Sequence, residues 1–123
     1  METIMIQEPD AAILKRLTAA LEMEGFRVYS LTDYKENILE MIRRHRPKLV
    51  LLDRRFSNYS GKQISHWIKA HFPRLPLIAF GCDNPIDQEY DRYGFDDYVK
   101  KPFDLNAFYQ VIKRYLPKRR KMT

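Results

Sequence analysis

The sequence has few of the residues that build disulfide-linked, metal-centred or membrane-spanning proteins. It contains a single cysteine, Cys82, so it cannot form an internal disulfide. Its three histidines, His45, His66 and His71, show no metal-ligand spacing with that cysteine, which argues against zinc and haem. No apolar stretch approaches the roughly 20 residues needed to cross a bilayer, and the start, Met1-Glu2-Thr3, lacks the positively charged lead of a secretory signal. We therefore expect a cytoplasmic protein with no membrane partner.

Internal repeats, low-complexity segments and shifts of composition are also lacking in these 123 residues, 45% of which are hydrophobic. A chain of this size has room for one globular domain with a single core. Its formal charge of +6 would permit binding to nucleic acid or to an acidic partner, but much of the excess lies near the end. We predict one domain over residues 1–117 and a basic tail at 118–123, which is either solvated or in contact with a polyanion.

Short apolar runs alternate with segments of helical periodicity about five times along the chain. We expect strands at Thr3–Ile6, Phe26–Ser30, Lys48–Leu52, Leu75–Phe80 and Asp97–Lys100. Strands that alternate with helices, with right-handed connections, form a parallel sheet with helices on both faces. The prediction is therefore an α/β protein, a flavodoxin-like (βα)5 three-layer sandwich with strand order 2-1-3-4-5.

The expected helices have recognisable starts, ends and apolar faces. Asp10 suits the N-cap of the first helix, and Gly25 lies just past its end. The apolar face of the third helix includes Trp67, which we expect in the core. A fourth helix from Asn84 has a sparse apolar stripe and should be the loosest, whereas a fifth from Asp104 has good amphipathic spacing.

Asp53 ends the apolar run that begins at Lys48, and it is the strongest candidate for a reactive residue. Such a run suits a strand buried on both faces, and ligands of parallel sheets bind outside the carboxyl ends of the strands. The predicted strand order brings together, at that edge, Glu8, Asp10, Asp53, Gly81, Cys82 and Lys101. Taken alone, Asp53 fits a turn aspartate about as well, so its neighbours must decide.

Three stretches of the sequence resemble the receiver domains of bacterial two-component response regulators. They are Leu49–Asp53 with Gly61 downstream, Leu75–Phe80, and Asp96–Phe103. The resemblance covers nearly the whole chain, and the last stretch, which contains a Lys-Pro pair, is the most specific. It implies phosphorelay signal transduction, in which Asp53 accepts a phosphoryl group from the phosphohistidine of a sensor histidine kinase or phosphotransfer protein.

The same resemblance implies roles for residues around the phosphoacceptor. Lys101 would contact the phosphoryl oxygens, next to a cis peptide bond at Pro102. Tyr98 occupies the position of the family's aromatic switch, although an aromatic residue near a strand end also serves packing alone. A magnesium ion would take as ligands Glu8, the phosphoacceptor carboxylate and the backbone carbonyl of Arg55.

Two positions depart from the family pattern. Pro9 stands in place of the second carboxylate of an acidic pair, a direct magnesium ligand, so magnesium binding should be weakened. Asp10 either reaches inward to replace it or only caps the first helix. Gly81 stands in place of the hydroxyl that turns toward the phosphoryl group, and it lacks a side chain to do so. Arg55 either folds over the site, paired with Asp83, or faces solvent.

These observations leave several functions open. A receiver with this site is a phosphoryl acceptor or a phosphorylation-independent interaction module, and not an enzyme. Its output would be a contact with a downstream protein through the fourth helix, fifth strand and fifth helix, where homodimers also form. A basic nucleic-acid-binding or adaptor protein would use the C-terminal Lys/Arg cluster, without a sequence-specific reader. A hydrolase with an aspartate nucleophile would normally have a second acidic residue two positions after it, but Arg55 occupies that position, which argues against this function.

Overall fold

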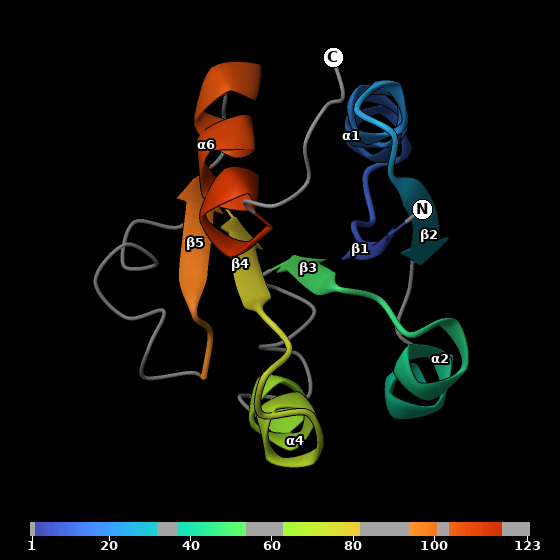
Figure 1. The fold of residues 1–123 in the computed structure, drawn as a ribbon, viewed down its shortest axis with the longest axis vertical. Coiled ribbons are helices and arrows are strands. Elements are labelled where there is room, and N and C mark those ends of the chain that lie inside the picture. Colours follow the sequence, from blue (N-terminus) through green and yellow to red (C-terminus); the bar gives the residue numbers. More distant parts are fainter. Residues whose placement is uncertain (1, 32–36, 54–62, 82–93, 101–103, 117–123) are drawn as a thin grey trace.

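The computed structural model describes residues 2–31, 37–53, 63–81, 94–100 and 104–116. Its centre is a five-stranded parallel sheet with the order β2-β1-β3-β4-β5 (Figure 1). The strands are β1 (Thr3–Gln7), β2 (Arg27–Leu31), β3 (Leu49–Asp53), β4 (Leu77–Gly81) and β5 (Asp97–Lys100). The predicted fold class and strand order are confirmed, with strand ends shifted by at most two residues.

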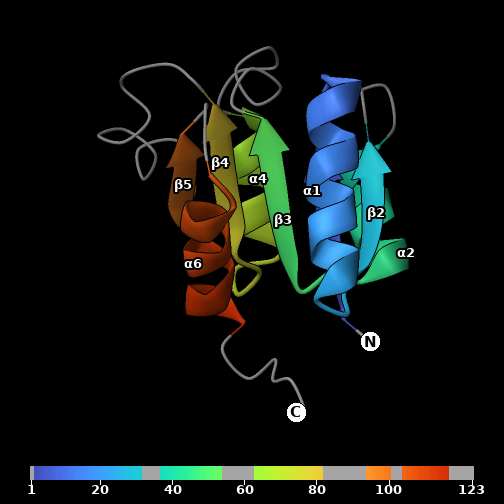
Figure 2. The same ribbon diagram turned by 90° about the horizontal axis from the view of Figure 1, so that it is seen from above.

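Helices cover both faces of the sheet, because right-handed connections change face where the strand order reverses, between β1–β2 and the later strands. The helices α1 (Ala11–Met23) and α6 (Leu105–Tyr115) lie on one face (Figures 1 and 2). The helices α2 (Ile38–His45) and α4 (Gln63–His71) lie on the other. The helix predicted from Asn84 and the basic tail at 118–123 lie outside the described residues. Among the helices that are described, none is long and apolar enough to cross a membrane.

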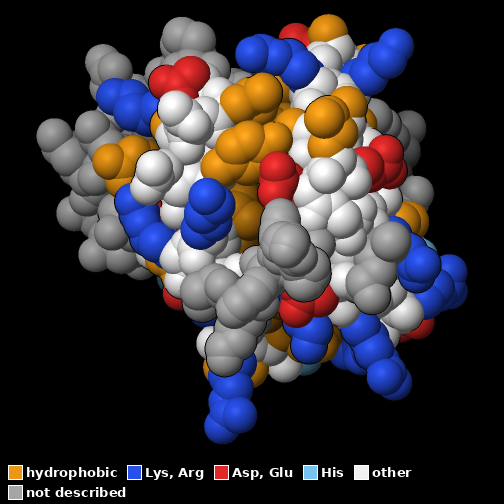
Figure 3. Space-filling view, turned by 45° about the horizontal axis from the view of Figure 1, so that its top comes forward, with side chains coloured by type: hydrophobic (Ala, Val, Ile, Leu, Met, Phe, Trp, Pro, Cys, Tyr) orange, Lys and Arg blue, Asp and Glu red, His pale blue; other side chains and the backbone are white. Residues whose placement is uncertain are grey.

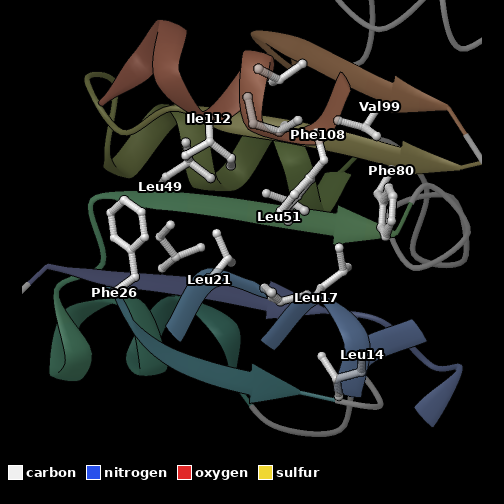
Figure 4. Close-up of a cluster of buried hydrophobic side chains, with 14 residues drawn as sticks. Leu14, Leu17, Leu21, Phe26, Leu49, Leu51, Phe80, Val99, Phe108 and Ile112 are labelled. Atoms are coloured by element: carbon white, nitrogen blue, oxygen red, sulfur yellow. The ribbon is translucent and has the colours of Figure 1, made fainter. Parts of the chain in front are cut away.

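The core consists of two hydrophobic clusters, one on each face of the sheet. Side chains alternate along a strand, so Leu49 and Leu51 of β3 join the cluster under α1 and α6 (Figure 4). Val50 and Leu52 join the cluster under α2 and α4. All four are completely buried. This burial on both faces explains why the sequence of β3 is continuously apolar up to Asp53.

Trp67 is 55% exposed, so the prediction that it lies in the core was wrong. The side of α4 that faces the sheet contains Ser65 and Ile68, which are completely buried. Residues three apart share a helix face, and Trp67 is rotated away from the face that these two define. The apolar spacing around Trp67 was compatible with either orientation, and the packing of Ile68 decides between them.

The ends of the helices follow the signals in the sequence. Asp10 caps α1 by accepting hydrogen bonds at Oδ1 from the N–H groups of Ala12 and Ile13, at 2.9 and 3.2 Å. Gly25, just beyond α1, has a φ of 92°, a left-handed conformation that glycine adopts without strain. Asp104 caps α6 as Asp10 caps α1. These three predictions are confirmed.

Candidate functional site

Asp53 is the last residue of β3 and is only 1% exposed. It pairs in register with Phe80, one residue before the end of β4. The strand therefore delivers a carboxylate to the carboxyl edge of the sheet while keeping it almost out of water. Burying a carboxylate in this way costs free energy unless neighbouring groups replace its lost hydration.

Glu8 brings a second buried carboxylate to the same edge. It follows β1 and is completely buried. Gln7 of β1 pairs in register with Leu52 of β3. Glu8 follows Gln7 and Asp53 follows Leu52, so the two acidic residues occupy equivalent positions on neighbouring strands. The Oε2 of Glu8 accepts a hydrogen bond from the N–H of Asp10 at 2.9 Å, which orients it at the start of α1. The edge thus holds two buried acidic side chains from adjacent strands.

Asp10 has a structural role that Glu8 and Asp53 do not share, because its side chain caps helix α1. It is exposed, and its Oδ1 accepts the first-turn N–H groups of α1. Its contact with Glu8 is made through its backbone N–H and not through its carboxylate. Of the two alternatives for Asp10, the structure shows the helix cap.

The strands on the other side of Asp53 contribute Gly81 and Tyr98. Gly81 is buried, ends β4 and pairs in register with Lys100. Tyr98 lies in β5, is half-buried and packs against the cluster under α2 and α4. The remaining predicted site residues, Lys101, Pro102 and Arg55, lie outside the described part of the chain, as do Cys82 and Asp83.

Sequence reasoning missed Gln7, the residue between β1's apolar run and Glu8. Its side chain is only 2% exposed, and its Oε1 has no hydrogen-bond partner within the described residues. An amide oxygen buried in this way is unusual, because burial without a partner costs free energy. The signal was present in the sequence, since Gln7 is a polar residue at the end of an otherwise apolar strand, directly before the acidic position.

Two of the described carboxylates at this edge, Glu8 and Asp53, are of the residue type that would hold a magnesium ion. Magnesium is usually held by one or two carboxylates together with water, and Glu8 and Asp53 match that requirement in number and position. Asp10 is engaged as a helix cap. Within the described ranges, no three side chains of His, Cys, Asp or Glu gather closely enough to hold a metal ion.

The opposite, amino edge of the sheet is stabilised by an ionic network around β5. Lys69 Nζ of α4 lies 2.8 Å from Asp96 Oδ2 and also donates to the carbonyl of Leu75 at 2.9 Å. The same Asp96 Oδ2 accepts the N–H of Leu77 at 2.9 Å. These bonds tie α4 and the start of β4 to the residue before β5. They fix the strand that leads to Lys101 at the other edge.

Comparison with known proteins agrees with this geometry. A family model described as the response regulator receiver domain matches residues 4–113. The chain is 29% identical over 121 residues to the polar-differentiation response regulator DivK of Brucella anthropi, and the match covers 94% of this chain and 96% of DivK.

Solved structures show the same fold. The receiver domain of NtrX from Brucella abortus has a TM-score of 0.79 at 24% identity, over 93% of this chain and 98% of that one. The chemotaxis protein CheY4 of Vibrio cholerae has a TM-score of 0.80 at 16% identity, over 94% of this chain and 98% of that one. At these identities the likeness is one of fold.

Proposed function

Since this chain belongs to the family of response regulator receiver domains and therefore acts in two-component signalling, we propose that Asp53 is its phosphoacceptor. The observation that carries the proposal is the burial of Asp53 at the carboxyl end of β3, one strand away from Glu8. In the transfer, an oxygen of the Asp53 carboxylate attacks the phosphorus of a partner's phosphohistidine. The P–N bond breaks, the imidazole leaves, and an aspartyl phosphate forms.

Receiver domains generally bind Mg²⁺ at an acidic pocket. We propose that here Glu8 and Asp53 are its side-chain ligands, with the backbone carbonyl of Arg55, and that Lys101 contacts the phosphoryl group. A bound Mg²⁺ would neutralise charge that builds up on the phosphoryl oxygens. Pro9 offers no side-chain oxygen, so binding should be weaker than with a complete acidic pair.

Receiver domains work with histidine kinases or phosphotransfer proteins and with downstream effectors, and in general they are signalling domains and not enzymes. We propose that this chain follows that pattern, in the cytoplasm, and that its output contact is made by β5 and α6. A hollow of about 530 Å³ between these elements supports this, and Tyr98, Lys100 and Arg114 are among its lining residues. β5 is also the last strand in the sheet order, and an edge strand offers hydrogen-bonding groups to a partner. A homodimer would use the same face.

A phosphorylation-independent interaction module is the second candidate function. Pro9 and Gly81 favour it, because each removes a side-chain oxygen that the family's mechanism uses. In that case the partner would recognise a single state of the β5 and α6 face.

Intact mass after incubation with acetyl phosphate, with and without Mg²⁺, separates the two candidates. The expected result is one phosphoryl adduct on the wild-type protein, formed faster with Mg²⁺, and none on the Asp53→Asn variant. The protein must be folded, and a known receiver serves as the positive control. If no adduct forms under either condition, the result favours the phosphorylation-independent module. An equal adduct on Asp53→Asn would show that the acceptor is another residue.

A further inference from the structure

A second cavity lies at the amino edge of the sheet, at the far end of β3 from Asp53. Its volume is about 590 Å³, and residues of 42–48 and 72–76 line it; we call it the basic pocket. These residues come from the end of α2 and the connection from it into β3, and from the connection that leads from α4 into β4 (Figure 1). From Leu49 to Asp53 the strand rises about 13 Å at roughly 3.3 Å per residue, so the two sites are separate.

Four cationic side chains line the basic pocket: Arg43, Arg46, Lys48 and Arg74. All four are exposed, and none of the described residues that line the pocket is acidic. One carboxylate lies close by, since Glu40 Oε1 is 3.3 Å from Arg43 Nη1, and that pair is about half-exposed. Figure 3 shows Lys and Arg side chains along the lower edge of the molecule as well as elsewhere around its outline. The pocket therefore has a surplus of positive charge.

The rest of the lining is apolar. It consists of Ile42, Phe72, Leu75 and the three prolines Pro47, Pro73 and Pro76. The guanidinium of Arg43 lies 6.0 Å from the centre of the Phe72 ring, within the range of a cation–π contact. A concave, mainly apolar surface with a few charged groups is the usual composition of a binding site.

Cations at the end of a helix also stabilise the helix dipole, and Arg43 and Arg44 in the last turn of α2 do so. The dipole does not account for the whole set, because Lys48 lies beyond the helix and Arg74 follows a different helix. Arg46 has a φ of 48°, which is a left-handed conformation. This conformation costs an arginine free energy, whereas a glycine adopts it without that cost. Cations from the end of α2 and its following connection, and from the connection after α4, thus line one cavity.

We propose that the basic pocket docks an acidic peptide segment of a partner protein. Carboxylates of the segment would pair with Arg43, Arg46, Lys48 and Arg74, and an apolar side chain between them would pack on Phe72 and the prolines. Charge complementarity selects an acidic partner, and the apolar lining selects a peptide over a nucleic acid, whose phosphates would leave that lining uncovered. This proposal does not depend on phosphorylation of Asp53.

The test is a titration of the ¹⁵N-labelled full chain, at low salt, with the peptide acetyl-Glu-Glu-Leu-Phe-Glu-Glu-amide, followed by amide chemical shifts. We expect saturable shifts confined to residues around 42–48 and 72–76. Hexaglutamate, ATP and a short DNA duplex serve as competing ligands. The variants Arg43→Gln and Arg74→Gln should each weaken binding by a factor of about 1.5 to 5, the range for single exposed charge pairs. The matched control is Arg44→Gln, which removes an equal charge from the same helical turn but not from the pocket.

Three outcomes would overturn the proposal. The first is a peptide titration without saturable shifts at the pocket. The second is equally tight binding of hexaglutamate, ATP or DNA, which would assign the site to unspecific charge or to phosphate ligands. The third is an equal loss of affinity in Arg43→Gln and Arg44→Gln, which would show that only net charge matters. The ¹⁵N spectra of the free variants establish that each is folded.

Discussion

Tyr115, in the last turn of α6, donates its hydroxyl to Asp97 Oδ2 at 3.1 Å, and Asp97 is the first residue of β5. The hydroxyl is also 3.1 Å from the carbonyl of Asp96, and Arg114 Nη1 lies 2.5 Å from the same Asp97 oxygen. The end of α6 is thus fastened to the start of β5. Burial first, and then the charge of Asp97, raise the pKa of Tyr115 to about 12.

Removing this hydroxyl should destabilise the fold. We expect Tyr115→Phe to lower the free energy of unfolding by about 1 to 2 kcal/mol, because a hydrogen bond to a charged acceptor is lost. The control is Tyr109→Phe on the same helix, whose hydroxyl donates to a neutral carbonyl, that of Ala20, at 3.3 Å and should contribute less. Urea unfolding of both variants measures the difference, and an equal effect would contradict the expectation.

The same contact predicts a pH dependence at the alkaline end only. The pKa of Tyr115 is higher in the folded protein than its ordinary value of 10.0, so the folded state favours the protonated hydroxyl. Its contribution to stability is fully present below pH 10 and is lost as the pH rises from 10 to about 12. The difference in unfolding free energy between wild type and Tyr115→Phe should therefore be constant near neutral pH and shrink above pH 10. A difference that grew with alkaline pH would refute this assignment.

The role of Asp10 can be separated from that of the acidic site. Asp10→Ala should lower stability by about 1 kcal/mol, the usual effect of removing an N-cap. It should leave phosphorylation of Asp53 and its magnesium dependence unchanged, because its carboxylate is engaged by the first turn of α1. Asp104→Ala removes the equivalent cap of α6, and thermal unfolding should show a similar loss. A loss of magnesium dependence in Asp10→Ala alone would instead make Asp10 a ligand.

Two neighbouring residues of α4 should differ strongly in how much their truncation destabilises the fold. Trp67→Ala should change stability by no more than about 0.5 kcal/mol, as is usual for exposed positions. Ile68→Ala should cost about 2 to 5 kcal/mol, because it leaves a cavity in the cluster under α2 and α4. Chemical denaturation measures both, and a large effect of Trp67→Ala would show that this side chain is covered in solution.

Restoring a carboxylate at position 9 should strengthen magnesium binding. We expect Pro9→Asp to raise the affinity about tenfold, measured as the magnesium concentration at half-maximal rate of phosphorylation by acetyl phosphate. Pro9→Ala is the control, because it removes the proline without adding an oxygen ligand. Equal magnesium dependence in the two variants would mean that position 9 does not face the ion.

The sequence was sufficient to predict the sheet, its strand order, the position of Asp53 and the caps Asp10 and Asp104. The strands and caps depend on local signals, namely apolar runs and capping side chains, and the strand order follows from the alternation of strands with helices. Trp67 was misplaced because the apolar spacing of α4 allowed two orientations, and contacts with distant residues choose between them. The basic pocket and the burial of Gln7 Oε1, which has no partner among the described residues, depend in the same way on which segments meet in space.

The central claim is that Asp53 accepts a phosphoryl group, and the most direct measurement is the position of the modification. After incubation with acetyl phosphate and Mg²⁺, reduction with borohydride converts an aspartyl phosphate to homoserine, which fragment masses of the digested protein can locate. We predict homoserine at position 53 and at no other aspartate. Homoserine at another position, or phosphorylated protein that yields no homoserine at position 53, would contradict the claim that Asp53 is the phosphoacceptor.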